Sequence, residues 1–582
     1  CACKPSSRLA DAARAAMSLF DTKATNWGDD DDDEKKDASK LSANAPTFSF
    51  GAPPPAAAAP TSFSFDAPKE PVRTTTERTT SNQSSVGGIT ETLSKQAVSV
   101  VETVQTAEGD TIQVQRADGA AALVAARTWE ELNLDPALLK GVYLANFAKP
   151  FKIQEAALPL ILDGFKKTPV RENLLAQAKS GSGKTAAFAL GMLQNVDLTK
   201  PHVQGLCVCP TRELATQNAA VVRLIGKTLV EEKGLVVALA LSEGPSGGRG
   251  RGGRGRGRGA RQEPIRGHIV VGTPGRTLQL IKARALDTRG ISMLVLDEAD
   301  EMDARGHRDD TRSLRKALPD ACQVLCFSAT YTDEVVKDIE TSVFKRHPSS
   351  KVLIAATDED RSALMVHEIA HVWCDAKEHP QGKIGIVEDI YDLLSAQQSI
   401  IFVNTRKDVS SITQVLKAKN FSVEDLTGGR GSTGMDAGER DRVMAAFRDG
   451  KVKVLITTNV IARGIDVPGV NIVINYDLPV VIDYSIPRGA SQKPPEPDSD
   501  TYIHRVGRTG RAGARGVAIN LVDQAQSNNQ DLAVLAALET RCFGAQKAPW
   551  TMIQKVPDAS DVEAIKDMVR KKMASSSSAE GK

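Results

Sequence analysis

Two stretches far apart in this sequence carry residues suited to chemistry on a nucleotide. The loop from Ala178 to Thr185 reads Ala-Lys-Ser-Gly-Ser-Gly-Lys-Thr, and the run from Leu294 to Asp300 reads Leu-Val-Leu-Asp-Glu-Ala-Asp. Glycine-rich turns that open a helix direct backbone N–H groups at phosphate oxygens, and acids beyond a buried strand can hold a metal. The alternatives are a helix start that binds no nucleotide and acids that only cap the next helix.

Each side chain of these stretches suggests one task. Ala178 replaces the first glycine of the phosphate-loop pattern, but the Gly-Lys-Thr core is kept. We expect Lys184 to reach the β- and γ-phosphates of ATP, and Thr185 and Asp297 to ligate Mg²⁺. We expect Glu298 to orient and deprotonate the attacking water. The loop residues expected to bind nucleotide are Ser180, Gly181, Ser182, Gly183, Lys184 and Thr185.

Short apolar runs predict the strands that position these groups. The runs Leu174–Ala176, Leu206–Cys209, Met293–Leu296 and Val324–Phe327 are typical of buried strands in a parallel sheet. Four later runs have the same character and alternate with helical stretches such as 438–447, which predicts a second parallel sheet without a phosphate loop. These later runs are Ser399–Asn404, Val452–Thr458, Val470–Asn475 and Val517–Val522.

Composition limits the class of protein. With 74 basic and 72 acidic residues the net charge of +2 carries no information about nucleic acid, so a basic surface must be sought locally. Cys207, Cys209 and Cys326 sit inside predicted strands and Cys322 lies just before one. No spacing of the eight cysteines suggests zinc, which favours reduced structural thiols in an intracellular protein. No apolar run is long enough to span a membrane. Residues 1–122 lack a sustained hydrophobic period and are expected to be disordered.

Three segments of the first unit have features suited to RNA. Pro210-Thr-Arg-Glu-Leu and Thr273-Pro-Gly-Arg each follow a predicted strand, and their hydroxyl, guanidinium and N–H groups suit contacts to phosphodiesters. Between them, residues 244–261 alternate arginine with glycine. Such a loop cannot form a core, and its arginines would follow a phosphate backbone, although an inert linker is the alternative.

The second unit offers arginines that suit a transferring phosphoryl group. The phrase from His504 to Arg511 places Arg508 and Arg511 three residues apart among glycines. Guanidinium groups at this spacing can stabilise the charge that develops during phosphoryl transfer. Because the phosphate loop lies on the other unit, the sequence predicts a cleft that closes over ATP.

In their order and wording, these motifs resemble those of the DEAD-box RNA helicases. The resemblance covers roughly residues 126–545 and implies two tandem RecA-like α/β domains and ATP hydrolysis that depends on RNA. It divides the chain into a disordered N-terminal extension, a first domain, a linker, a second domain and a tail. The limits are 1–122, 123–355, 356–364, 365–560 and 561–582.

The resemblance also assigns roles to further residues. It implies that Gln154 reads the adenine edge, that Phe147 stacks on the base and that Trp129 supports this contact. It implies coupling between the domains through Asp300, Ser328 and Thr330, a ribose or phosphate contact from Asp466, and catalysis by Lys184, Asp297, Glu298, Arg508 and Arg511. The single-stranded RNA contacts that it implies are Pro210, Thr211, Arg212, Thr273, Gly275, Arg276, Arg406, Thr457 and Thr458.

A narrower likeness points to one subgroup of this family. Residues 128–162, 454–466 and 497–504 resemble the helicases that release export factors from mRNA at the cytoplasmic face of the nuclear pore. This implies a monomer of the cytoplasm and nucleus that remodels messenger ribonucleoprotein, with a pore-associated activator and inositol hexakisphosphate as partners. The alternative function is an ATP-gated RNA clamp whose slow hydrolysis serves only release.

Overall fold

The computed structural model describes the chain in segments. These are residues 99–105, 111–117, 124–167, 171–242, 263–304, 307–353, 365, 368–393, 398–427, 435–459, 467, 469–481, 495–510, 515–524, 530–544 and 552–556. Across these segments, no helix combines the length and apolar character that a membrane span requires. The Gly/Arg stretch 244–261, Asp466 and Arg511 lie outside the described residues.

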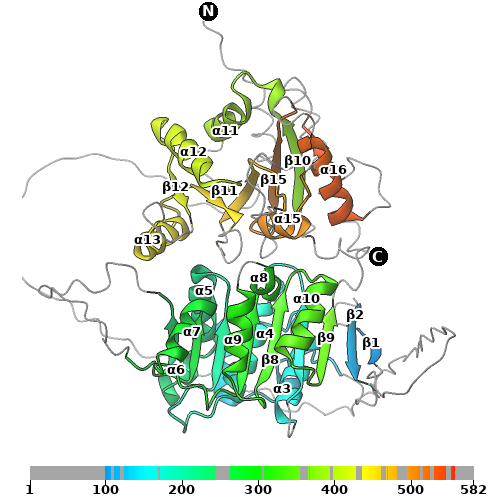
Figure 1. Cartoon of the computed structure of the whole chain (residues 1–582), viewed down its shortest axis with the longest axis vertical. Coiled ribbons are helices and arrows are strands. Elements are labelled where there is room, and N and C mark those ends of the chain that lie inside the picture. Colours follow the sequence, from blue (N-terminus) through cyan, green and yellow to red (C-terminus); the bar gives the residue numbers. More distant parts are fainter. Residues whose placement is uncertain are drawn as a thin grey trace, which may run out of the picture. The chain divides into compact units, whose positions relative to one another are not determined.

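Nine strands form the first sheet, in the order β1-β2-β9-β3-β8-β7-β4-β6-β5. Figure 1 shows one end of this sheet, where β2 lies between β1 and β9. All pairs from β9 to β5 are parallel. The strands are β1 (Ser99–Gln105), β2 (Thr111–Ala117), β3 (Asn173–Gln177), β4 (Gly205–Val208), β5 (Val237–Ala240), β6 (Ile269–Gly272), β7 (Met293–Asp297), β8 (Gln323–Ser328) and β9 (Ser349–Leu353).

Helices lie between the strands of this sheet along the chain. They are η1 (Glu130–Leu132), α2 (Pro136–Leu144), α3 (Lys152–Lys166), α4 (Lys184–Asn195), α5 (Arg212–Ile225), α6 (Lys227–Lys233), α7 (Pro274–Lys282), α8 (Ala299–Ala304), α9 (Arg308–Lys316), α10 (Asp333–Asp338) and the π-helical turn η2 (Ile339–Val343). The expected strands of this unit are all present.

The first two strands correct the prediction that residues 1–122 are disordered throughout. Strands β1 and β2 pair antiparallel with each other, and β2 pairs antiparallel with β9. The segment Thr111–Ala117 alternates apolar and polar residues, and its Ile112 and Val114 are buried in the core below the sheet. The alternation is only seven residues long. Its burial depends on a strand more than 200 positions away, so the local pattern alone did not reveal it.

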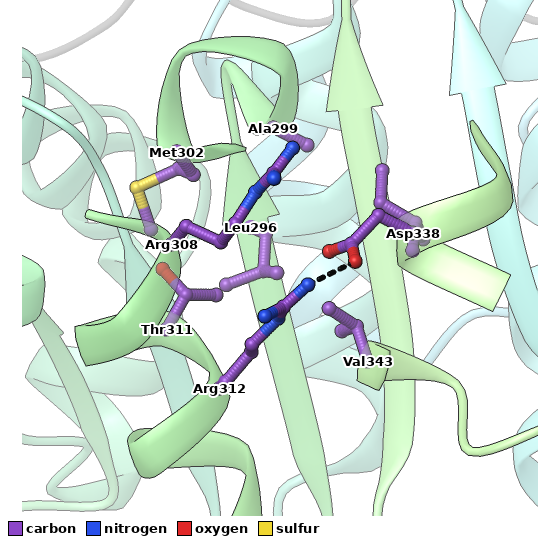
Figure 2. A pocket seen from close by; sticks show the side chains of 9 residues that line it. Leu296, Ala299, Met302, Arg308, Thr311, Arg312, Asp338 and Val343 are labelled. Atoms are coloured by element: carbon purple, nitrogen blue, oxygen red, sulfur yellow. Dashed lines mark hydrogen bonds and ion pairs between the residues drawn. The ribbon is translucent and has the colours of Figure 1, made fainter. Parts of the chain in front are cut away.

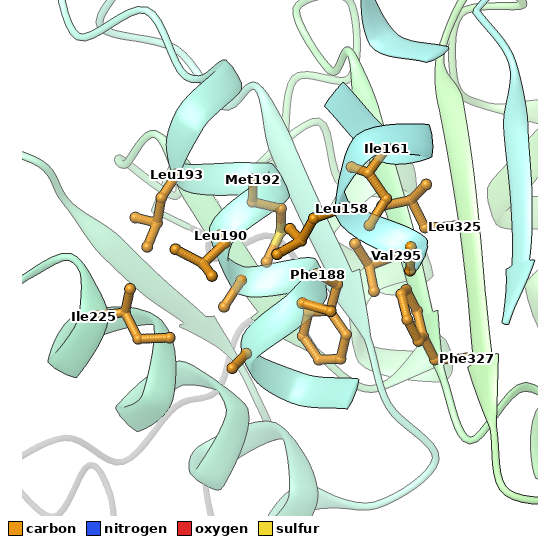
Figure 3. Packing of buried hydrophobic residues seen from close by; sticks show 14 of the residues in the cluster. Leu158, Ile161, Phe188, Leu190, Met192, Leu193, Ile225, Val295, Leu325 and Phe327 are labelled. Carbon is orange, nitrogen blue, oxygen red and sulfur yellow. The ribbon is translucent and has the colours of Figure 1, made fainter. Parts of the chain in front are cut away.

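Side chains of the first sheet alternate between two cores. Leu174, Cys207, Val295 and Phe327 face the core that includes helices α3, α4 and α5. Their chain neighbours, such as Leu175 and Leu206, face the core that includes α7, α8, α9 and η2. Figure 3 shows the first core, where the rings of Phe188 on α4 and Phe327 on β8 lie 5.4 Å apart. This packing holds the start of α4 against the strands that carry the predicted site.

Seven strands form the second sheet, all parallel, in the order β12-β13-β11-β14-β15-β10-β16. They are β10 (Ile369–Asp375), β11 (Gln398–Val403), β12 (Val423–Leu426), β13 (Val454–Thr458), β14 (Val470–Asn475), β15 (Gly516–Val522) and β16 (Ile553–Lys555). The helices are η4 (Ala376–Glu378), α11 (Gly382–Leu393), α12 (Arg406–Ala418), α13 (Ala437–Arg448), α15 (Ser499–Val506) and α16 (Gln530–Phe543). The two predicted parallel-sheet units are therefore confirmed. Both lie within the same compact part of the chain.

Candidate nucleotide and RNA site

The phosphate loop joins β3 to α4 and depends on two glycines with positive φ. Gly181 has φ 79° and Gly183 has φ 90°. A Cβ at Gly183 would lie 2.5 Å from Gln154 Nε2 and 2.9 Å from Phe151 Cδ2, whereas a Cβ at Gly181 would meet nothing within 4 Å. Gly183 therefore permits both the positive φ of the turn and the close approach of helix α3. A residue with a Cβ would be disfavoured on both counts.

Lys184 begins α4 and turns its amine back into the loop. Its Nζ donates to the carbonyl oxygens of Ala178 at 2.6 Å and Lys179 at 3.1 Å. Burial lowers the pKa of Lys184, while the charges of Glu298 and Asp297 act in the opposite direction. The ammonium is thus held by backbone carbonyls between the loop and the acids.

Asp297 ends β7 with both carboxylate oxygens engaged. Its Oδ1 accepts from the Glu298 backbone N–H at 3.1 Å, and its Oδ2 accepts from Asn218 Nδ2 at 2.7 Å. Burial, followed by the charge of Glu298, raises the pKa of Asp297 to about 7. Glu298 has φ 51°, an uncommon backbone conformation for a non-glycine residue that often marks functional sites.

The oxygen groups predicted to hold Mg²⁺ lie at the end of β7 and in the first turn of α4. Asp297 offers a carboxylate and Thr185 a hydroxyl, the oxygen ligands that hard cations prefer. Glu298 Oε2 is a buried acceptor without a hydrogen-bond partner among the described residues. A cluster of buried acids with an unsatisfied oxygen fits a site that a cation or its water ligands complete.

Asp300 links the acids to β8 and the loop that follows it. Ser328 Oγ donates to its Oδ1 at 2.6 Å and Thr330 Oγ1 donates to its Oδ2 at 2.8 Å. The three residues that were expected to couple the domains therefore lie in direct contact. All three are buried, so these hydrogen bonds form without competition from water.

His504, which the sequence motifs did not mark as a site residue, joins this network from α15. It is 1% exposed. Its Nε2 lies 3.4 Å from Thr330 Oγ1 and 3.5 Å from Asp300 Oδ2, and its Nδ1 lies 3.9 Å from Glu298 Oε2. His504 is the first residue of the motif from His504 to Arg511, so the sequence could have indicated it. The chemistry predicted for that motif involved only the guanidinium groups.

Arg508 reaches the phosphate loop from the second sheet. Its Nε donates to the carbonyl oxygen of His504 at 3.0 Å and its Nη2 donates to Ser180 Oγ at 3.1 Å. A Cβ at the neighbouring Gly507 would lie 3.0 Å from Ser180 Cβ, so glycine permits this approach. The described member of the predicted arginine pair therefore lies beside the loop.

The segment before α3 and the first turn of this helix hold the residues expected around adenine. Trp129 is 1% exposed and its Nε1 donates to the Phe147 carbonyl oxygen at 2.9 Å. Gln154 accepts from the Phe151 backbone N–H at 2.8 Å and donates to the Gly183 carbonyl oxygen at 3.0 Å. Phe151, the residue before α3, lies next to Gly183 of the phosphate loop and is 51% exposed. The sequence motifs did not indicate this aromatic side chain at the site.

The predicted RNA contacts of the first unit lie beyond the carboxyl ends of β4 and β6. Thr211 accepts from the Leu214 N–H as the N-cap of α5, and Thr273 directly precedes α7. Arg276 Nη1 donates to Gln279 Oε1 at 2.9 Å. Pro210 is buried, and Gly275 lies close to Asp310. Parallel strands bring these segments to the edge that also carries Asp297.

Two ion pairs join the start of α5 to the start of α13. Arg212 donates from Nη2 to Asp441 Oδ2 at 2.9 Å, and Arg440 Nη2 donates to Glu213 Oε2 at 2.7 Å. Arg212 Nη1 also donates to the Ser242 carbonyl oxygen at 2.6 Å. The predicted RNA-binding guanidinium is therefore engaged by a carboxylate of the second unit.

The predicted RNA contacts of the second unit differ in exposure. Arg406 is exposed at the start of α12. Thr457 is fully buried, and its hydroxyl donates to the Leu426 carbonyl oxygen at 2.7 Å. Thr458, which ends β13, is also buried. The Thr457 hydroxyl is therefore engaged inside the fold, so Thr457 would hold neighbouring RNA-binding residues in place and would not contact RNA through its hydroxyl.

A separate pocket lies next to the acidic run, between α9 and α10. Figure 2 shows its lining, in which Arg312 of α9 forms an ion pair with Asp338 of α10. The other lining residues are Leu296, Ala299, Met302, Arg308, Thr311, Ile339 and Val343. None of the residues predicted to bind nucleotide, metal or RNA is among the lining residues.

Comparison with known families decides the class. Residues 151–339 match the DEAD/DEAH box helicase family, and residues 382–513 match the helicase conserved C-terminal domain. Together they cover more than half of the chain. The chain belongs to the DEAD-box ATP-dependent RNA helicases. The described motifs are therefore those of a helicase, as predicted.

Relatives of this helicase are similar over most of its length. ATP-dependent RNA helicase DBP5 of Meyerozyma guilliermondii is 38% identical over 415 residues, which cover 71% of this chain and 76% of that protein. ATP-dependent RNA helicase DDX19A of Bos taurus is 39% identical over 420 residues, 72% of this chain and 78% of that protein.

Solved structures of Dbp5 from S. cerevisiae have the same fold. Dbp5 bound to RNA and ADP BeF3 is 34% identical with a TM-score of 0.62, covering 77% of this chain and 100% of that one. A single-substitution variant of Dbp5 bound to a variant of Gle1 and to IP6 gives a TM-score of 0.56 at the same identity and coverage.

Proposed function

We propose that this helicase uses Mg²⁺ and ATP to remodel messenger ribonucleoprotein during mRNA export from the nucleus. The observation that carries the mechanism is the buried hydrogen-bonded chain from Asp300 through Thr330 to His504. This chain connects the acids of the first sheet to a helix of the second. Hydrolysis of the nucleotide bound at the acids can thereby alter the contacts between the two parallel-sheet units.

Hydrolysis is assigned to the residues around the phosphate loop. Lys184 would exchange its two carbonyl partners for phosphate oxygens, and Glu298 would take the proton of the attacking water. Asp297 and Thr185 would hold Mg²⁺, which supplies positive charge to the phosphates when it is bound. Arg508, with Arg511 three residues later in the sequence, would stabilise the charge that develops on the transferred group.

Binding of the base is assigned to the segment before α3 and to the first turn of this helix. Phe147 would stack on adenine with its backbone held by Trp129, and Gln154 would read the base edge while its amide remains tied to Gly183. The remaining loop residues, Ser180, Gly181 and Ser182, would present N–H groups to the phosphates. Asp466 would contact ribose or phosphate.

RNA is assigned to the strand-end surface of both units. Arg212, Arg276 and Arg406 would bind phosphates. The other predicted RNA contacts would hold the RNA strand through hydroxyl or backbone groups, without reading its bases. The edge that the first-unit segments share with the acids supports this assignment. The similar Dbp5 structure holds RNA and a nucleotide together.

Partners and location are proposed from similarity. The Dbp5 structure with Gle1 and IP6 supports a protein activator that acts with inositol hexakisphosphate. We place this activity at the cytoplasmic face of the nuclear pore, with the helicase acting as a monomer. Crosslinking and pull-down from cells should recover poly(A) RNA and pore proteins, and recovery of neither would contradict this placement.

The central test compares ATP turnover with and without single-stranded RNA. RNA should raise turnover in the wild type, and Glu298→Gln should abolish most of it. Glu301→Gln, which neutralises a buried acid nearly one turn along α8, is the matched control. Turnover that is insensitive to RNA and unchanged by Glu298→Gln would refute the mechanism.

A second measurement distinguishes remodelling from clamping. A protein bound beforehand to single-stranded RNA should be displaced with ATP and not with a nonhydrolysable analogue. If the helicase itself stays on RNA equally long with both nucleotides and displaces nothing, the ATP-gated clamp is the better description. The comparisons do not support that alternative.

A further inference from the structure

Asn218 is a buried amide that none of the motifs explains. It lies in α5, six residues after Arg212, and is 0% exposed. Its Nδ2 donates to Asp297 Oδ2 at 2.7 Å and to Cys209 Sγ at 3.2 Å. Its Oδ1 has no hydrogen-bond partner among the described residues.

The orientation of this amide follows from its partners. A carboxylate oxygen only accepts, so the NH₂ group and not the carbonyl oxygen must face Asp297. The oxygen is then left in a buried position without a donor among the described residues, which costs stability. An apolar residue of the same size would avoid this cost, so packing alone does not account for an asparagine at this position.

The hydrogen bond completes a two-point hold on the carboxylate of Asp297. One oxygen is held by the Glu298 backbone N–H and the other by Asn218. Two donors on two different oxygens fix the plane of the carboxylate, while each oxygen keeps a lone pair for another partner. Partners of metal-ligating carboxylates act in this way by orienting the ligand.

We propose that Asn218 is a positioning residue for the Mg²⁺–nucleotide complex, holding Asp297 in the orientation that receives the cation. The inference rests on the metal role assigned to Asp297 under the proposed function. Asn218 itself would touch neither nucleotide nor metal. Cys209, the second neighbour of the amide, accepts from the same NH₂ group and carries no part of the positioning role.

The test measures binding of a fluorescent ADP to the full chain, without RNA, in magnesium chloride and in EDTA. The ratio of the two affinities is the magnesium increment. Asn218→Leu keeps the branched shape of the side chain and removes the donor, so the increment should fall about 10-fold while binding in EDTA stays within about twofold of the wild type. Cys209→Ala removes the sulfur beside the same amide and should keep the wild-type increment.

A second variant separates this role from damage to the fold. Asn218→Ser is smaller, cannot overpack the site and is too short to reach Asp297, so it should lose the increment to a similar extent. Thermal unfolding without nucleotide reports the packing cost of each variant. Equal losses in magnesium and in EDTA, or an unchanged increment in both variants, would overturn the inference.

The wild type provides the check on the underlying assumption. If ADP binds the wild-type chain equally well in magnesium and in EDTA, the metal role of Asp297 fails, and the inference fails with it. If the wild type shows an increment that both Asn218 variants keep, only the positioning role of Asn218 is refuted.

Discussion

Arg508 Nη2 donates to Ser180 Oγ at 3.1 Å, so a side chain of the second sheet lies on the phosphate loop of the first. Arg508 is 4% exposed as a residue, and its guanidinium is held from behind by the carbonyl oxygen of His504. An arginine held in this way is oriented before any phosphate arrives. This reduces the ordering that the transition state requires.

Arg508→Lys should therefore lower ATP turnover by about 10³-fold, because a lysine keeps the charge and loses the planar fork. Affinity for ATP should change far less than turnover. Steady-state hydrolysis with saturating RNA measures the effect. Arg541→Lys on α16, a half-exposed arginine paired with Glu496, is the control and should hydrolyse ATP as the wild type does. Equal turnover in both variants would remove Arg508 from the mechanism.

Gly183→Ala should abolish nucleotide binding, whereas Gly234→Ala should not. Both glycines have positive φ, 90° and 72°, so each substitution carries a backbone cost of about 1 kcal/mol. Only Gly183 would also place a Cβ 2.5 Å from Gln154, which adds roughly 1–3 kcal/mol of overpacking. Denaturant unfolding and fluorescent ADP binding test both effects, and Gly183→Ala with normal nucleotide affinity would contradict the proposed loop geometry.

Asp441→Ala should tighten binding of single-stranded RNA. Asp441 engages Arg212, which we assign to an RNA phosphate, so the carboxylate and the phosphate compete for one guanidinium. The pair is partly exposed and is worth at most about 1 kcal/mol, which limits the gain to roughly fivefold.

Arg212→Ala should act in the opposite direction. It should weaken RNA binding and reduce the slope of log affinity against log salt by about 1. Fluorescence anisotropy across a salt series measures both variants. If Asp441→Ala still tightens binding when Arg212 is already alanine, the competition is not through this pair.

Deleting residues 247–261 should weaken RNA binding and flatten its salt dependence while nucleotide affinity stays the same. The reason is the loss of interleaved arginines that neutralise phosphates. A variant in which the same residues are replaced by glycine and serine of equal length separates charge from loop length. Unchanged RNA affinity would make the segment a linker.

The strands and the phosphate loop of the site could be predicted well because each is marked by a local pattern in the sequence. Apolar runs such as Met293–Leu296 marked the buried strands, and glycine spacing marked the phosphate loop. Asn218 and His504 were missed because their significance comes from tertiary contacts. Nothing in the chain near Asn218 shows that it meets Asp297, 79 residues later, and nothing near His504 shows that it lies close to Glu298 and Asp300.

The hairpin of β1 and β2 has a practical consequence for anyone who shortens this chain. Strand β2 covers the backbone N–H and C=O groups of β9, which would otherwise form an open edge of the first sheet. A chain trimmed to the family match at residue 151 would expose that edge and leave it ready to pair with other copies. Such a fragment would also lose core residues that precede position 151, such as Trp129 and Leu138, so its poor solubility would reflect both the missing strand and a reduced core.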